Sequence, residues 1–210
     1  RHIHLIEEPR AAAIGANLPI DQPFGNMVVD IGGGTTEVAV ISMFAIAYSE
    51  SVRVAGDEGN DAILRYMQRG RQMIISEVLA ERIKMKIGTA APPEQPRSMD
   101  ITGKEIISGI PRTVTVTDEE IREAIKEPVM AIVESVKRAL EKTPPDLAAD
   151  IHERGIWLAG GGALLSGLDR LLQQTTHLKV NIADDPLTAI VRGAGAVIEN
   201  MDFYRQVFIN

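Results

Sequence analysis

Two glycine triplets, each directly after an apolar run, are the residues of this chain best suited to chemistry. The first is Gly32, Gly33 and Gly34, after the run 27–31, and the second is Gly160, Gly161 and Gly162, after the run 156–159. Glycine adopts positive φ and lets backbone approach a ligand closely, so successive N–H groups at a strand end can converge on a phosphate. Two such turns predict a nucleotide cleft.

The first turn combines N–H donors with a carboxylate and hydroxyl groups. Asp30 ends the preceding run, and Thr35, Thr36 and Glu37 follow the glycines. A carboxylate at this point could hold Mg²⁺ through water while the turn surrounds phosphates. An ordinary hairpin turn that Asp30 merely caps would use the same residue types. A Walker loop does not fit, because no Gly-Lys-Ser/Thr ending and no following helix are present.

The second turn continues into Ala163 and an apolar helical stripe that begins at Leu164. A positive helix end there would favour a phosphate or a polar ribose contact. A dinucleotide-binding fold is the alternative, since Asp184 and Asp185 follow the next strand at about the distance of a ribose-binding acid. That alternative is weakened because the spacing is not Gly-x-Gly-x-x-Gly and little chain follows the turn.

Two further groups of residues could complete a cleft. Ala80, Glu81 and Lys84 fall on one face of an expected helix, where the small side chain would admit a flat ring. A surface ion pair between Glu81 and Lys84 is the alternative. Near the start of the chain, Glu7 or Glu8 could orient a water molecule for attack on a phosphorus atom, or could simply cap the helix that follows.

Other kinds of chemistry find little support in the sequence. The chain has no cysteine, which excludes disulfides and thiolate chemistry and fits a reducing cytoplasm. The four histidines show no metal-ligand grouping and are interpreted as surface or packing residues, and no Gly-x-Ser-x-Gly motif is present. A net charge of -7 over 210 residues argues against a general affinity for nucleic acid. No apolar run is long enough to span a bilayer.

Alternating apolar runs and helical stripes predict an α/β sheet covered on both faces. Strands are expected at 3–6, 27–31, 37–41, 155–159 and 178–182, the second and third forming a hairpin. Helices are expected at 10–14, 56–70, 73–87, after a capping box at Thr117, after Pro145, at 164–174 and from Pro186. Pro128 should kink or restart the helix that contains it. Short edge strands are expected at 98–102 and 113–116.

Five motifs, taken in order, resemble the MreB family of bacterial actin-like proteins. They are IEEPRAAAIG at 6–15, VDIGGGTTE at 29–37, AGDE at 55–58, AERIK at 80–84 and LAGGG at 158–162. Single motifs of this kind recur among actins, heat-shock chaperones and sugar kinases. Their combination with LEKTPP at 140–145 is specific to the MreB family, and the resemblance covers essentially the whole chain.

The resemblance implies an actin-like ATPase fold, a ribonuclease H-like mixed sheet flanked by helices with a small α+β subdomain inserted, and ATP and Mg²⁺ as cofactors. By position, Glu8 would polarise the attacking water and Asp30 would contact Mg²⁺ through water. The remaining sites follow in order: Gly32, Gly33, Gly34 and Thr35 as the second phosphate hairpin, Ala80, Glu81 and Lys84 near the adenosine, and Gly160, Gly161, Gly162 and Ala163 in the base and ribose pocket.

The same resemblance implies partners and a place in the cell. The complete protein would polymerise with itself into filaments at the inner, cytoplasmic face of the membrane. Together with the cell-wall elongation machinery, those filaments would determine cell shape, and nucleic acid would not be a partner. A chaperone-like or sugar-kinase-like ATPase of the same superfamily and a non-catalytic assembly module are the alternatives.

The expected domain division follows the same family. Residues 1–23 would be a strand and connecting helix left from the first domain, 24–49 with 113–185 the second ATPase-fold subdomain, 50–112 the small insertion, and 186–210 helices that return toward the first domain. The family's first phosphate hairpin, Asp-x-Gly-Thr, is absent. ATP hydrolysis would therefore belong to the complete protein. Segment 70–79, and Phe44 with Ala45 at a usual glycine turn, depart from the family pattern.

Overall fold

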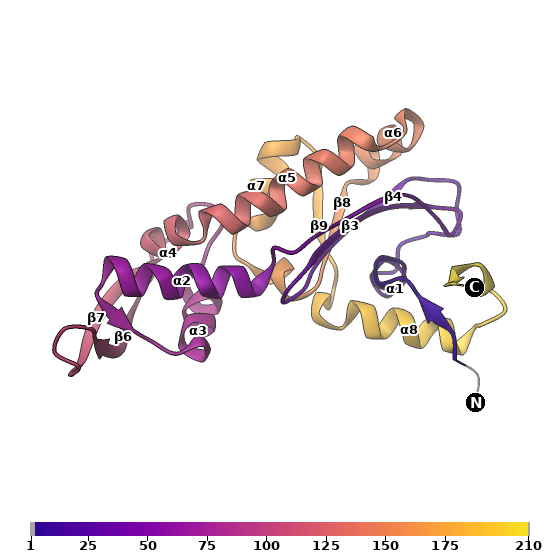
Figure 1. The fold of residues 1–210 in the computed structure, drawn as a ribbon. Coiled ribbons are helices and arrows are strands. Elements are labelled where there is room, and N and C mark those ends of the chain that lie inside the picture. The colour runs from indigo at the N-terminus through magenta and orange to yellow at the C-terminus, as the bar shows by residue number, and fades with distance from the viewer. Residues whose placement is uncertain (1–2, 210) are drawn as a thin grey trace.

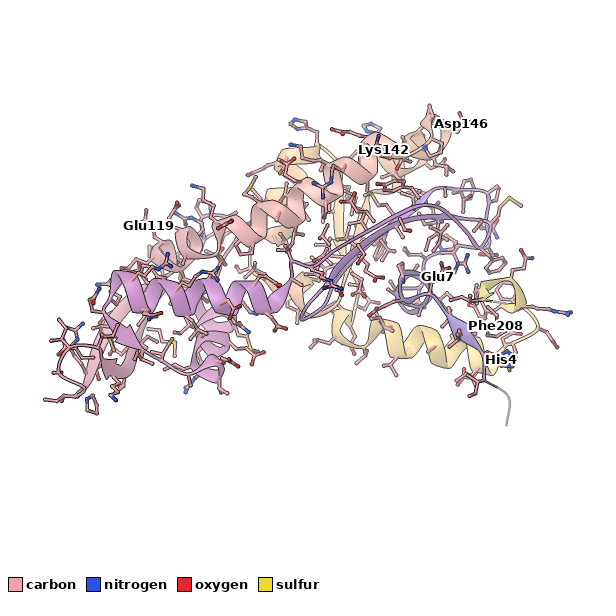
Figure 2. All side chains as sticks on the ribbon, viewed as in Figure 1. His4, Glu7, Glu119, Lys142, Asp146 and Phe208 are labelled. Atoms are coloured by element: carbon pink, nitrogen blue, oxygen red, sulfur yellow. The ribbon has the colours of Figure 1, made fainter. Side chains whose placement is uncertain are left out.

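The computed structural model describes residues 3–209, so the expectations that concern Arg1 and His2 lie outside the described residues. The molecule is elongated, with a large sheet and its helices at one end and a smaller sheet at the other (Figure 1). Near the N-terminus, β1 (Leu5–Ile6) pairs antiparallel with β10 (Phe208–Ile209). The His4 and Phe208 rings lie 4.7 Å apart at that pair (Figure 2). The two ends of the chain are thereby joined.

The large sheet has five strands in the order β4-β3-β2-β8-β9. Their bounds are β2 (Asn26–Ile31), β3 (Thr36–Ser42), β4 (Ala45–Val52), β8 (Ile156–Ala159) and β9 (Val180–Ile182). β2, β3 and β4 form an antiparallel meander, whereas β8 runs parallel to both β2 and β9. The expected hairpin and the mixed sheet are confirmed.

Helices cover both faces of this sheet (Figure 1). On one face lie α1 (Glu8–Gly15) and α8 (Ala189–Glu199), and on the other lie α5 (Lys126–Lys142), α6 (Pro145–Arg154) and α7 (Leu168–Thr176). Every residue of β2 is buried, as expected for a central strand that is covered on both sides.

Alternate residues of β2 and β3 enter two different cores, because successive side chains of a strand point to opposite faces. Met27 and Val29 pack in the core that contains α5. Val28 and Ala39 pack in the core that contains α1 and α8. By the same alternation, Asp30 and Glu37 belong to the face that carries α1.

The smaller end consists of a three-stranded antiparallel sheet, β5-β6-β7, with three helices packed beside it. Its elements are α2 (Gly56–Gly70), β5 (Met73–Ile74), α3 (Glu77–Ile87), β6 (Ser98–Glu105), β7 (Pro111–Thr117) and α4 (Asp118–Ala124). β7 runs across the expected boundary at 112/113 and pairs with β6 along its whole length. The domain division itself stays a prediction.

The expected continuous helix over 73–87 is wrong. Gln72 has a positive φ of 54°, Met73 and Ile74 form β5 against β6, and the Ser76 hydroxyl accepts a hydrogen bond from the Leu79 N–H to begin α3. The apolar residues at 73–75 suited either structure by periodicity. Pairing with β6 decided the outcome.

Two other helix expectations have different results. The capping box at Thr117 is confirmed, and the helix restarts near Pro128, since α4 ends at Ala124 and α5 begins at Lys126. The expected helix over 164–174 is wrong at its start. A 3₁₀ turn, η1 (Gly161–Leu164), comes first, and Gly167, with φ 75°, separates it from α7.

The chain after β9 returns across the sheet. Pro186 begins a 3₁₀ turn, η2 (Pro186–Thr188), which leads into α8, and η3 (Arg205–Val207) precedes β10. α8 packs against α1 so closely that a Cβ on Gly193 would lie 1.9 Å from the Ala11 carbonyl oxygen. Glycine at this position is therefore required by the helix packing.

The turn between β3 and β4 places Met43 and Phe44 at φ values of 47° and 63°, the conformation that two-residue hairpin turns fill with glycine or asparagine. Met43→Gly should stabilise the chain by about 1 kcal/mol, because glycine adopts this positive φ without the steric strain of a Cβ. Few contacts are lost, since Met43 is 62% exposed. Phe44→Gly should destabilise it, because the Phe44 ring meets those of Phe203 and Tyr204 at 5.5 and 6.1 Å. Urea unfolding of both variants checks this pair.

Candidate functional site

The two glycine turns lie side by side at the carboxyl ends of neighbouring parallel strands. Strands β2 and β8 pair in a register that places Asp30 opposite Ala159. The two triplets therefore leave the sheet at the same level. A Cβ on Gly160, where φ is 77°, would lie 2.3 Å from the Ile31 carbonyl oxygen, and one on Gly162 would lie 2.1 Å from the Ile31 Cγ2. The second turn therefore packs against the residue directly before the first, which brings the two triplets side by side, as a shared nucleotide cleft requires.

The first turn has the features of an anion-binding hairpin. The Gly32 N–H donates to the Thr35 carbonyl at 2.9 Å and closes the turn. Gly33, Gly34 and Thr35 are exposed, and a Cβ on Gly34 would meet no atom within 4 Å. Thr36 is different, since its buried hydroxyl donates to the Val54 carbonyl at 2.7 Å and so serves the fold.

Asp30 is buried beside this turn, with 3% of its surface exposed. Within residues 3–209, its Oδ1 has no hydrogen-bond partner, so Asp30 does not cap the hairpin through that atom. Burial, then the negative charges of Glu8 and Glu37, raises the pKa of Asp30 from 3.8 to about 6. A buried carboxylate oxygen without a partner fits a site that a cation or its bound water completes.

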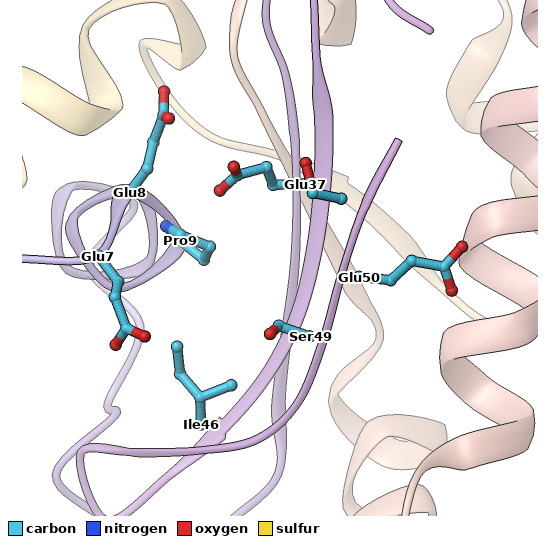
Figure 3. A pocket seen from close by; sticks show the side chains of 8 residues that line it. Glu7, Glu8, Pro9, Glu37, Ile46, Ser49 and Glu50 are labelled. Carbon is cyan, nitrogen blue, oxygen red and sulfur yellow. The ribbon is translucent and has the colours of Figure 1, made fainter. Parts of the chain in front are cut away.

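Glu8 and Glu37 both line a cavity of about 250 Å³ between α1 and the β3–β4 pair, and the Glu37 carboxylate points toward α1 (Figure 3). Burial, then the charges of Glu8 and Glu7, raises the pKa of Glu37. Glu50 also lines the cavity, but its carboxylate points away and accepts a hydrogen bond from the Arg138 Nε at 2.9 Å (Figure 3).

The two acids at the start of α1 have separate roles. Glu7 stands at the N-cap position without a side-chain cap bond and pairs with Arg10 at 2.9 Å. Glu8 is the first residue of α1, is exposed, and has no side-chain hydrogen bond or ion pair within the described part of the chain. Glu8 is therefore not used as a cap, and its carboxylate is free to bind water.

The residues expected near an adenosine lie on α3, which contacts the start of α2 through Lys84. Glu81 is exposed, and Ala80 is fully buried, so Ala80 offers packing behind its neighbours and no open surface. The surface ion pair between Glu81 and Lys84 is not among the salt bridges of residues 3–209. Instead, the Lys84 Nζ donates to the Gly56 carbonyl at 2.6 Å.

At the second turn, the expected contact with an α-helix terminus is wrong, because Gly161 begins a short 3₁₀ turn and α7 starts only at Leu168. Gly161 is exposed, Gly162 is half-buried and Ala163 is buried. Asp185, the competing ribose acid, accepts a hydrogen bond from the Thr188 hydroxyl at 2.5 Å. The antiparallel β2–β3–β4 meander also excludes the all-parallel dinucleotide-binding fold.

Sequence reasoning missed Glu37 and Asp57 as neighbours of the site. Strand alternation could have found Glu37, because the hairpin register places it opposite Asp30 on the same face. No sequence signal places Asp57, whose carboxylate Oδ2 would lie 3.4 Å from a Cβ on Gly33. Its position depends on how α2 docks on the hairpin.

Asp30→Asn is expected to stabilise the ligand-free chain at neutral pH. The pKa of Asp30 is higher in the folded state than in the unfolded state, so the folded state binds a proton more tightly. This protonation contributes fully to the stability of the fold below pH 3.8, and its contribution is lost as pH rises through about 6. Above that pH, the buried carboxylate costs on the order of 2–3 kcal/mol, which asparagine avoids.

Urea unfolding in EDTA at pH 4 and pH 8 measures this difference. The exposed acid variant Asp61→Asn serves as the control, because it removes one charge from the outer face of α2. An equal gain from Asp30→Asn at both pH values contradicts the prediction.

A sequence profile described as MreB/Mbl protein matches residues 1–206. The chain belongs to the MreB/Mbl family. The cell shape-determining protein MreB of Escherichia coli strain K12 is 51% identical over 204 residues, which are 97% of this chain and 59% of that protein. The cell shape-determining protein Mbl of Bacillus subtilis strain 168 is 48% identical over 202 residues, 96% of this chain and 61% of that protein. The chain thus spans about three fifths of these MreB/Mbl relatives.

Solved structures support the same MreB/Mbl assignment. MreB5 of Spiroplasma citri bound to AMPPNP superposes with a TM-score of 0.90 at 36% identity, covering 95% of this chain and 60% of that one. A MamK double helical filament superposes with a TM-score of 0.78 at 21% identity, covering 92% and 59%, and shows the fold alone. The expected actin-like fold is confirmed. Within residues 3–209, no helix is long and apolar enough to cross a membrane.

Proposed function

We propose that this chain forms one side of an ATP- and Mg²⁺-binding cleft in a filament-forming protein of the MreB/Mbl family. The observation that carries the proposal is the packing of the second glycine turn against Ile31, directly before the first turn and beside the buried, unpartnered Asp30. The MreB5 relative was solved with AMPPNP and with ADP, which supports a nucleotide as the ligand. Gly32, Gly33, Gly34 and Thr35 would contact phosphate, and Gly160 to Ala163 would border the base and ribose.

The protein groups fit Mg²⁺ as a cofactor shared with phosphate. Within residues 3–209, no group of three or more His, Asp or Glu side chains is placed to hold a metal by itself. Magnesium commonly keeps several waters and takes phosphate oxygens with one or two carboxylates, so Asp30 suffices as the protein's contribution. When bound, Mg²⁺ supplies positive charge that neutralises phosphate oxygens.

Glu8 would hold and orient the water that attacks the terminal phosphate. Glu8 and Glu37 line the same cavity, so two carboxylates that could accept a water proton lie near one another. The exposed backbone of the hairpin would fix the phosphate, and hydrolysis would follow from positioning together with charge stabilisation. Hydrolysis would require the complete protein.

The wider role comes from the relatives. MreB and Mbl are described as cell shape-determining proteins. We assign this chain to filaments of the complete protein at the inner face of the cytoplasmic membrane, with the cell-wall elongation machinery as partner. A chaperone-like or sugar-kinase-like ATPase would turn over ATP without filaments, and an assembly module would form filaments without ATP. Sedimentation with and without ATP separates the three.

The catalytic assignment is tested in the chain completed with the part of the Escherichia coli relative that lies outside the matched residues. Glu8→Gln is expected to slow ATP hydrolysis by about 10²–10⁴-fold and to change ATP affinity little in calorimetry. Glu7→Gln is the matched control, because Glu7 directly precedes Glu8 in the chain and its carboxylate already forms an ion pair with Arg10. Hydrolysis at the unmodified rate in Glu8→Gln would show that the assignment is wrong. Absence of ATP binding in the parent chimera would refute the nucleotide proposal itself.

A further inference from the structure

Lys84 makes a specific contact with the start of α2. Its Nζ donates to the Gly56 carbonyl at 2.6 Å, and its stem packs on α2, where a Cβ on Gly59 would lie 3.3 Å from the Lys84 Cδ. Burial lowers the pKa of Lys84, while the charges of Glu81 and Asp57 oppose that shift. The side chain is half-buried and committed to a backbone atom of another helix.

The start of α2 is in turn bonded to the first glycine turn. The Gly56 N–H donates to the Gly32 carbonyl at 3.2 Å, and the Asp57 N–H donates to the Gly33 carbonyl at 2.8 Å. Consecutive carbonyls of the hairpin thus hold consecutive amides of the helix. This arrangement fixes the orientation of the peptide planes whose N–H groups would face phosphate.

The three segments meet at one point. A Cβ on Gly56 would lie 3.2 Å from the Gly32 carbonyl oxygen and 3.3 Å from the Lys84 Nζ. The hairpin, α2 and the Lys84 side chain are therefore in tight contact at Gly56. A change in the position of α3 would therefore be transmitted to the hairpin through two hydrogen-bonded steps.

We propose that Lys84 is a positioning residue that holds the Gly32–Gly33 backbone in its phosphate-binding shape through Gly56 and Asp57. This differs from a role as a direct ligand of the adenosine. The nucleotide part of the inference rests on the proposed function, whereas the mechanical coupling does not. Through this contact, the small subdomain would set the affinity of the hairpin for phosphate.

Amide hydrogen exchange on the ligand-free chain tests the coupling. Lys84→Met should speed exchange of the Gly56 and Asp57 amides roughly tenfold or more, because removing the charged donor loosens the helix start. Lys84→Arg keeps a charged donor and should restore most of the protection. Lys86→Met is the matched control, since Lys86 is an exposed lysine on the same helix. Unchanged exchange in Lys84→Met, or equal acceleration along all of α2 and α3, overturns the proposal.

Truncated ligands distinguish positioning from direct contact. In the chimera completed from the Escherichia coli relative, Lys84→Met should weaken binding of ATP and ADP by about tenfold in calorimetry and leave adenosine binding unchanged, because only the phosphates use the hairpin. An equal loss for adenosine would show that Lys84 contacts the base or ribose, and the proposal would be wrong. If the parent chimera binds none of the three, the proposed function fails, and the exchange experiment alone decides the role of Lys84.

Discussion

Gly160→Ala is expected to destabilise the fold by about 4 kcal/mol or more. Gly160 has φ 77° and ψ 170°, a backbone conformation that is essentially restricted to glycine. Its added Cβ would also lie 2.3 Å from the Ile31 carbonyl oxygen and 2.5 Å from the Asp30 Oδ1. Both the β2–β8 contact and the proposed cation site would have to move.

Gly34→Ala is the matched control in the other glycine triplet. Gly34 does not have a positive φ, and its added Cβ meets nothing within 4 Å, so its stability should change by less than about 1 kcal/mol. Urea unfolding of the two variants gives both free energies. Similar losses in the two would contradict the account of the Gly160 turn given by the structure.

Gly193→Ala is expected to cost about 3–5 kcal/mol through the contact between α1 and α8. Here the backbone conformation is ordinary, and the expected loss of stability comes from steric overlap between the two helices. The added Cβ would lie 1.9 Å from the Ala11 carbonyl oxygen and 3.0 Å from the Gly15 N, both of them backbone atoms that cannot rotate away. The two helices would separate, and the strand pair β1–β10 beyond them would lose its support.

Gly195→Ala, two residues further along the same helix, should raise the stability of the fold and not lower it. Its Cβ would meet nothing within 4 Å, so alanine should stabilise α8 by about 0.5–1 kcal/mol through its higher helix propensity. Thermal unfolding of the pair provides the test. A loss in Gly195→Ala as large as that in Gly193→Ala would mean that the helix, and not its contact with α1, is the sensitive element.

Local rules predicted much of the fold. The 2-residue alternation and the glycine turn gave the β2–β3 hairpin, and the capping box at Thr117 gave the start of α4. The segments at 73–75 and 164–167 were predicted wrongly, because their apolar residues suit more than one structure. Pairing with β6 and the positive φ of Gly167 decided between them.

The sequence by itself determined that two glycine turns follow strands, that Asp30 stands at the first of them, and that the chain belongs with actin-like proteins. Those features depend on residues close together in the chain. Only the tertiary structure decided that the second turn packs against Ile31 beside the first, that Glu8 and Glu37 share a cavity, and that Lys84 reaches Gly56 in place of Glu81. These contacts join residues 28 to 131 positions apart, whose proximity is set by strand pairing and helix packing and by no local preference.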